Sequence, residues 1–183
     1  MMGRPKLTMP WRDSTVIEQV LAAWKASRVS HLIVVVRPDD QDLVDACRRS
    51  GIEPVIPGKS PPEMKVSVAI GLNHVQQVYE PSDDDSWLLA PADMPDLSPK
   101  VIDRLLEEHE SGAASILVPV NAGRRGHPVL FHWTVAEQVH TLGQDEGVNA
   151  LLSRNPVRKI AVTDQAIIDD LDTPEDYMRL RDA

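Results

Sequence analysis

The chain has 183 residues, of which 42% are hydrophobic and only 4% aromatic, and its formal net charge at pH 7 is -9. This length fits one domain with a single core rather than two full domains. The acidic balance argues against a broad nucleic-acid-binding face but is compatible with a compact phosphate pocket. Cys47 is the only cysteine, which excludes an intrachain disulfide and a multi-cysteine zinc site.

The N-terminal residues include prolines and basic side chains but no apolar run. Nowhere does an apolar stretch approach the length of a membrane span. Nothing in the cysteine content indicates an oxidising compartment. We therefore expect a cytoplasmic protein that binds neither a membrane nor nucleic acid.

Helical and extended patterns alternate along the first half of the chain. Apolar spacing predicts a helix over 14–26, with Asp13 or Ser14 as its N-cap. The β-branched run 31–36 predicts a strand that is buried on both faces. The elements expected next are a helix at 40–50, a strand at 53–56, a helix at 63–78 and a central strand at 86–90.

The alternation continues in the second half. The expected elements are helices at 99–111, 134–140, 146–154 and from 174 onward, with extended segments at 114–119, 126–131, 157–162 and 166–168. Such alternation predicts an α/β fold that is doubly wound, with a mostly parallel sheet and helices on both faces. Sheets of this kind bind ligands at the carboxyl ends of their strands.

Asp93 directly follows the predicted central strand and lies between Pro91 and Pro95. The two prolines restrict the backbone and hold the carboxylate in one direction. A fixed carboxylate suits Mg²⁺, which takes one or two protein carboxylates together with substrate phosphates and water. Asp170 and Asp172 are candidates for a second acid, although Asp172 is also placed to cap the helix that follows.

Basic residues supply candidates for phosphate contacts. Lys6 follows a glycine and can present a point charge to a triphosphate, whereas a lysine near an N-terminus is commonly only solvated. The turn Arg124 to Pro128 can contact a phosphorylated acceptor or simply be a solvated turn. His127 within it is expected to be a packed residue more often than a base, and Cys47 is expected to be a packing residue.

Five stretches, in order, resemble motifs of the MobA-like nucleotidyltransferase family, most closely those of its molybdenum cofactor cytidylyltransferases. They are Met2 to Leu7, Ala92 to Pro95, Gly123 to Val129, Gly143 to Leu152 and Asp170 to Asp176. The resemblance covers essentially the whole chain. It implies a Rossmann-like fold of the nucleotide-diphospho-sugar transferase type.

The resemblance also implies roles for individual residues. Asp93 corresponds to the aspartate that holds Mg²⁺ between the nucleotide phosphates, and Asp172 to the aspartate that completes the metal site. Arg125 and His127 lie in the GxRGHPV-like segment, which favours molybdopterin as acceptor. These matches favour Asp172 as a metal ligand over its capping role.

At the N-terminus, Gly3 and Lys6 match the end of a glycine-rich loop, and Lys6 falls on its phosphate-contacting lysine. The family begins with a strand followed by LAAGxSxRMG, so the sequence lacks the first strand and most of this loop. We expect a single domain over residues 1–183 that is truncated at its N-terminus relative to the family. The stretch Glu63 to Ser67 also differs, because cytidylyltransferases commonly read GMSxS there.

These features predict a Mg²⁺-dependent nucleotidyltransferase that transfers CMP from CTP to molybdopterin and releases pyrophosphate. CTP, or GTP, and molybdopterin are the expected partners, with a molybdoenzyme as a further one. The alternatives are the same chemistry with GTP or another phosphorylated acceptor, and a noncatalytic module that binds molybdenum cofactor.

Overall fold

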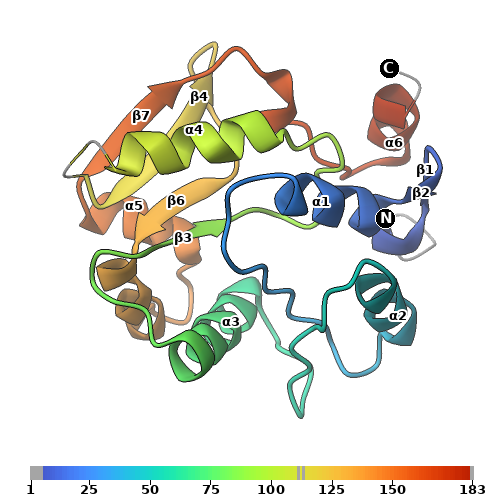
Figure 1. Ribbon diagram of the computed structural model, residues 1–183, viewed down its shortest axis with the longest axis horizontal. Coiled ribbons are helices and arrows are strands. Elements are labelled where there is room, and N and C mark those ends of the chain that lie inside the picture. The colour runs from blue at the N-terminus through green and yellow to red at the C-terminus, as the bar shows by residue number, and fades with distance from the viewer. Residues whose placement is uncertain (1–5, 111, 113, 182–183) are drawn as a thin grey trace.

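The computed structural model describes residues 6–110, 112 and 114–181, so the prediction for Gly3 lies outside the described residues. Its centre is a five-stranded sheet with helices on both faces (Figure 1). The strands are β3 (Ser86–Leu89), β4 (Ile116–Asn121), β5 (Arg124–Arg125), β6 (Val129–His132) and β7 (Val157–Ala161). The predicted α/β class is confirmed.

The sheet is mixed rather than mostly parallel. β4 pairs parallel with β7, whereas β6 lies antiparallel between β3 and β4, and β5 pairs antiparallel with β4. β6 follows β4 after only the short connection 122–128, and a parallel return would need a crossover of about a dozen residues or more. β3, β4 and β7 consequently run in the same direction, and their carboxyl ends lie on one side.

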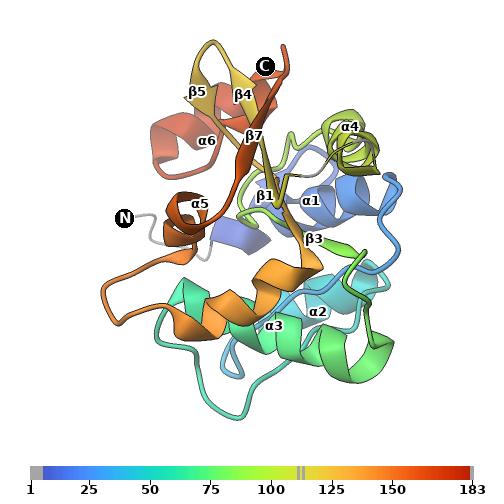
Figure 2. The ribbon, with the colours of Figure 1, turned by 90° about the vertical axis from the view of Figure 1, so that its left-hand side faces the viewer.

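Alternating side chains divide the core between the two faces of the sheet. Ile116, Val118 and Phe131 pack toward α3 (Met64–Tyr79), the 3₁₀ helix η2 (Trp133–Thr141) and α5 (Leu151–Arg154). Leu117 and Leu130 point to the opposite face and pack with α4 (Pro99–Glu110). Figure 2 shows α1 and α4 on one side and α3 and α5 on the other. This alternation is the period of two expected for strands covered on both faces.

The first helix is α1 (Val16–Lys25), and the prediction of Asp13 or Ser14 as its N-cap is wrong. Thr15 is the cap, and Glu18 completes a reciprocal capping box with it. Ser14 instead belongs to β2 (Ser14–Thr15), which pairs with β1 (Pro10–Trp11). A serine and a threonine side by side both satisfy a cap pattern, and the glutamate three residues after Thr15 selects the threonine.

The segment 31–36 is extended but forms no ladder, in contrast to the predicted strand. In the described part of the chain it bonds on one edge, to 53–56, through Val36 N to Val55 O at 3.0 Å and Val55 N to Val34 O at 2.8 Å. Within the described residues no ladder joins 31–36 to β3. The predicted strands at 31–36 and 53–56 therefore reduce to a single parallel bridge, because a strand requires continuous pairing along an edge.

The remaining helices match their predicted positions closely. α2 (Gln41–Arg49) is capped by Asp40, and Cys47 on it is fully buried, as expected of a packing residue. The predicted strand at 166–168 is wrong, because the 3₁₀ turn η4 (Gln165–Ile167) begins at the capping residue Asp164. The other elements are η1 (Lys6–Thr8), η3 (Val148–Ala150) and α6 (Pro174–Arg181). None of the helices in the described part of the chain is long and apolar enough to cross a membrane.

Candidate active site

Three distant segments meet just beyond the carboxyl end of β3. The backbone N–H of Leu171 donates to the carbonyl of Asp93 at 3.1 Å, which fixes the approach to α6 against the loop after β3. Leu171 and Met94 are both almost completely buried and anchor the two segments. Lys6, in η1, contacts both segments, through the carbonyl of Leu171 and the carboxylate of Asp93. The fold therefore places its N-terminal lysine at the ligand-binding end of the sheet.

The ammonium of Lys6 lies between two aspartates. It forms an ion pair with Asp93 Oδ2, donates to the carbonyl of Leu171 at 3.0 Å and contacts Asp172 Oδ1 at 3.4 Å. The side chain of Asp93 is only 13% exposed, whereas that of Asp172 is 71% exposed. Burial alone would lower the pKa of Lys6, but hydrogen bonds and charges from the two aspartates overcome it and raise the pKa. Lys6 is therefore a cation at neutral pH.

The second oxygen of Asp93 fits a metal ligand. Asp93 Oδ1 is buried and has no hydrogen-bond partner among the described residues, a costly arrangement unless another group satisfies it. Across the described residues, no group of three or more His, Cys, Asp or Glu side chains is arranged to hold a metal by itself. Two carboxylates that share the ion with phosphates and water match the coordination habit of Mg²⁺.

The start of α6 distinguishes between Asp172 as a helix cap and Asp172 as a metal ligand. Thr173 Oγ1 accepts from the backbone N–H of Asp176 at 3.1 Å, and Asp176 Oδ2 accepts from the backbone N–H of Thr173. Thr173 thus performs the capping role that also suited Asp172 by sequence. The carboxylate of Asp172 is turned toward Lys6 instead.

A cavity of about 190 Å³ lies beside this cluster. It is lined by Met94, Arg124, Arg125, Gly126, His127, Ile167, Ile168 and Asp170. Partial burial, together with the charges of Asp172 and Asp93, raises the pKa of Asp170. Asp170 is one of the two acids predicted from the sequence, because it follows the run 166–168 and precedes the helix that begins at Pro174. The structure adds that it lines the cavity.

His127 is held in place within the cavity wall. Its backbone N–H donates to the carbonyl of Ile167 at 2.7 Å. Burial lowers its pKa, and this effect exceeds the opposing influence of the Leu89 backbone and of the charges of Asp170 and Asp93. Nδ1 is buried with no partner among the described residues. The imidazole is therefore neutral at pH 7.

The predicted site residues thus fall into two groups. Lys6, Asp93 and Asp172 are brought into contact, whereas Arg125 and His127 line the adjacent cavity. Arg125 is exposed on β5 and lies next to the turn at Gly123, whose φ of 83° favours glycine.

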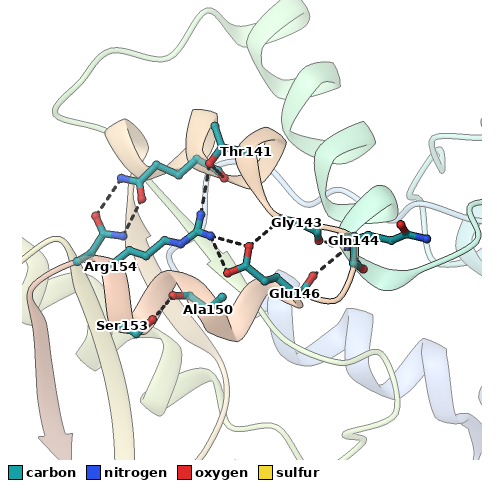
Figure 3. A network of polar contacts seen from close by, with 10 residues as sticks. Thr141, Gly143, Gln144, Glu146, Ala150, Ser153 and Arg154 are labelled. Atoms are coloured by element: carbon teal, nitrogen blue, oxygen red, sulfur yellow. Dashed lines mark hydrogen bonds and ion pairs between the residues drawn. The ribbon is translucent and has the colours of Figure 1, made fainter.

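One partly buried cation, Lys65, was missed by the sequence analysis. Lys65 Nζ donates to the carbonyls of Gly143 at 2.6 Å, Gln144 at 2.7 Å and Glu146 at 3.1 Å. Glu146 in turn pairs with Arg154 and accepts from the backbone N–H of Gly143 (Figure 3). The only sequence signal was the departure from GMSxS at 63–67. Lys65 connects the start of α3 to the loop 143–147.

A lysine between two carboxylates at the carboxyl end of a strand, beside a cavity with arginines, suits the phosphates of a metal-bound nucleotide. This site chemistry agrees with the class of nucleotide-using transferases. Residues 1–160 match the model of the MobA-like NTP transferase domain. The chain therefore belongs to the MobA-like NTP transferase family of nucleotidyltransferases.

Individual relatives agree with this assignment. A probable molybdenum cofactor guanylyltransferase of Bacillus mycoides is 29% identical over 185 residues, which cover 97% of this chain and 88% of the relative. The crystal structure of Rv0371c from Mycobacterium tuberculosis H37Rv is similar with a TM-score of 0.83 and 28% identity, covering 99% of this chain and 91% of that one. The crystal structure of Rv0371c in complex with manganese is similar with a TM-score of 0.81 and 27% identity, covering 99% of this chain and 94% of that one.

Proposed function

We propose that the protein transfers a nucleoside monophosphate from CTP or GTP to the terminal phosphate of molybdopterin and releases pyrophosphate. The observation that carries this proposal is the contact of Lys6 with both Asp93 and Asp172 at the carboxyl end of β3. Membership of the nucleotidyltransferase family and the name of the Bacillus relative support it.

The reaction is an in-line displacement at the α-phosphorus of the nucleotide. An oxygen of the acceptor phosphate forms the new bond to this phosphorus while the bond to the bridging oxygen breaks, and that oxygen leaves with pyrophosphate. No covalent enzyme intermediate is required, so the protein mainly positions and screens the reactants. Lys6 stabilises the triphosphate, and Arg125 and His127 place the acceptor in the cavity.

Asp93 and Asp172 are the residues that would hold a divalent cation, which we propose to be Mg²⁺. Two features support this choice: Asp93 Oδ1 is buried and has no partner among the described residues, and both ligands are carboxylates. When bound, the cation supplies neutralisation of the charge that develops on the phosphates. The manganese complex of the mycobacterial structure is consistent with a divalent cation in this fold.

Two observations point to different nucleotides. The segments Gly123 to Val129 and Gly143 to Leu152 resemble those of cytidylyltransferases and favour CTP. The name of the Bacillus relative favours GTP. A direct competition between CTP and GTP in one reaction decides between them, because specificity is the ratio of the two kcat/KM values.

Pyrophosphate release by purified protein with Mg²⁺, molybdopterin and either nucleotide tests the proposal. Asp93→Asn should reduce release by at least about a hundredfold, because it weakens the site of the cation that would neutralise the charge developing on the phosphates. Asp45→Asn, which changes an exposed carboxylate on α2, is the matched control and should retain activity. Equal release by wild type and Asp93→Asn would contradict the role of Asp93.

A noncatalytic module that binds molybdenum cofactor is the second candidate. It predicts that wild type binds molybdopterin and that Asp93→Asn binds it equally well, with no pyrophosphate released by either protein. The cavity beside the carboxylates supports binding of an acceptor under both candidates. A molybdoenzyme as recipient of the product and a cytoplasmic location remain predictions.

A further inference from the structure

Lys6 and a divalent cation require the same two carboxylates. The ammonium contacts Asp93 Oδ2 and Asp172 Oδ1 together, so it occupies the space between the two carboxylates that would hold the metal. Both groups are positively charged, and at such short range their mutual repulsion is substantial. Lys6 in this position therefore competes with a metal bound by both aspartates.

We propose that Lys6 is a built-in counter-ion of the metal site, which the arriving metal–nucleotide displaces from the carboxylates to the phosphates. This inference rests on the proposed function, because it assumes a metal-bound nucleotide as ligand. In this scheme one lysine has two positions. It neutralises Asp93 before the ligand binds and stabilises the triphosphate afterwards.

The burial of the three side chains supports such an exchange. A carboxylate as buried as Asp93 is costly without a compensating charge, which explains why a cation is held there. Lys6 is more accessible, with its side chain 31% exposed, and it belongs to a three-residue 3₁₀ turn rather than a long helix. Asp93 Oδ1 is buried without a partner among the described residues, so the contact with Lys6 compensates only one of the two oxygens of this carboxylate.

The exchange predicts effects of opposite sign for one substitution. Removing the ammonium with Lys6→Met should strengthen binding of a bare divalent cation, because its competitor is gone. The same change should weaken binding of the metal–nucleotide, because the phosphates lose a cation. A lysine that contacts only phosphates would leave bare-metal binding unchanged, and a purely structural lysine would weaken both.

Mn²⁺ binding, measured by electron paramagnetic resonance without nucleotide, is the first test. We expect Lys6→Met to bind Mn²⁺ roughly tenfold more tightly than wild type, equivalent to about 1.4 kcal/mol. Lys25→Met is the matched control, because Lys25 also donates to a backbone carbonyl, that of Ser50 at 2.9 Å, and should leave Mn²⁺ binding unchanged. Asp93→Asn should abolish the tight Mn²⁺ site and thereby assign it to this cluster.

The second test repeats the titration with Mn²⁺ and the α,β-methylene analogues of CTP and GTP, which resist transfer. Here Lys6→Met should bind roughly tenfold more weakly than wild type. Lys6→Gln provides a second variant, and circular dichroism verifies that both are folded. Unchanged or weaker Mn²⁺ binding in the folded variants, or no Mn²⁺ bound by any of the proteins, would overturn the inference. If wild type binds Mn²⁺ but neither analogue, the proposed function fails, and the Mn²⁺ titration still decides whether Lys6 competes.

Discussion

The neutral state of His127 makes stability depend on pH. Burial keeps its folded pKa below the ordinary value of 6.5, so the unfolded chain binds a proton at higher pH than the folded chain does. The stabilisation is therefore present above about pH 6.5 and is lost as the pH falls through and below this value. Urea unfolding at pH 7.5 and 5.5 should show a smaller loss of unfolding free energy in His127→Gln than in wild type. Equal losses in the two proteins would contradict a buried, neutral His127.

Gly126 packs directly against Ile167, and a Cβ atom at this position would overlap the carbonyl oxygen and side chain of Ile167. Gly126→Ala should lower the free energy of unfolding by about 1 to 3 kcal/mol, as expected when a well-packed position is overfilled. Gly147→Ala is the matched control, because a Cβ there meets nothing within 4 Å. Chemical denaturation of both variants checks this prediction, and equal stability losses would show that the contact with Ile167 is unimportant.

At the scale of elements, Lys65 connects the loop 143–147 to α3 by hydrogen bonds. Its side chain is only 13% exposed and donates to three carbonyls, which Lys65→Met would leave without this partner. We expect faster amide hydrogen exchange in 143–147 and a modest loss of stability. Lys25→Met again serves as control, because Lys25 contacts a single carbonyl far along the chain from this loop. Unchanged exchange in Lys65→Met would show that Glu146 and Arg154 alone hold the loop.

Helices were predictable from the sequence because their apolar spacing and caps are local. α2, α3 and α4 lie within a residue or two of their predicted ranges. The run 31–36 reads as a strand, but strand formation depends on partners elsewhere in the chain, and here pairing is limited to one bridge. The prediction of an extended segment at 166–168 was wrong for a local reason. The cap at Asp164 favours a 3₁₀ turn there and outweighs the short apolar run.

At the scale of the whole molecule, the site depends on contacts across nearly the full chain. Lys6 and Asp172 are 166 residues apart in sequence, and only the resemblance to a known family linked them beforehand. Neither periodicity nor composition indicated that the lysine contacts both carboxylates directly. The pattern of alternating elements also did not predict that β6 runs antiparallel to β4. The short connection 122–128 explains this orientation.

The central claim is nucleotidyl transfer that depends on the carboxylates around Lys6. Its most direct test is mass spectrometry of the products after incubation of the folded protein with Mg²⁺, molybdopterin and equimolar CTP and GTP. We predict a product with the mass of molybdopterin joined to one nucleoside monophosphate, formed by wild type and lost in Asp93→Asn. Molybdopterin and both nucleotides recovered unchanged from wild type would contradict the claim.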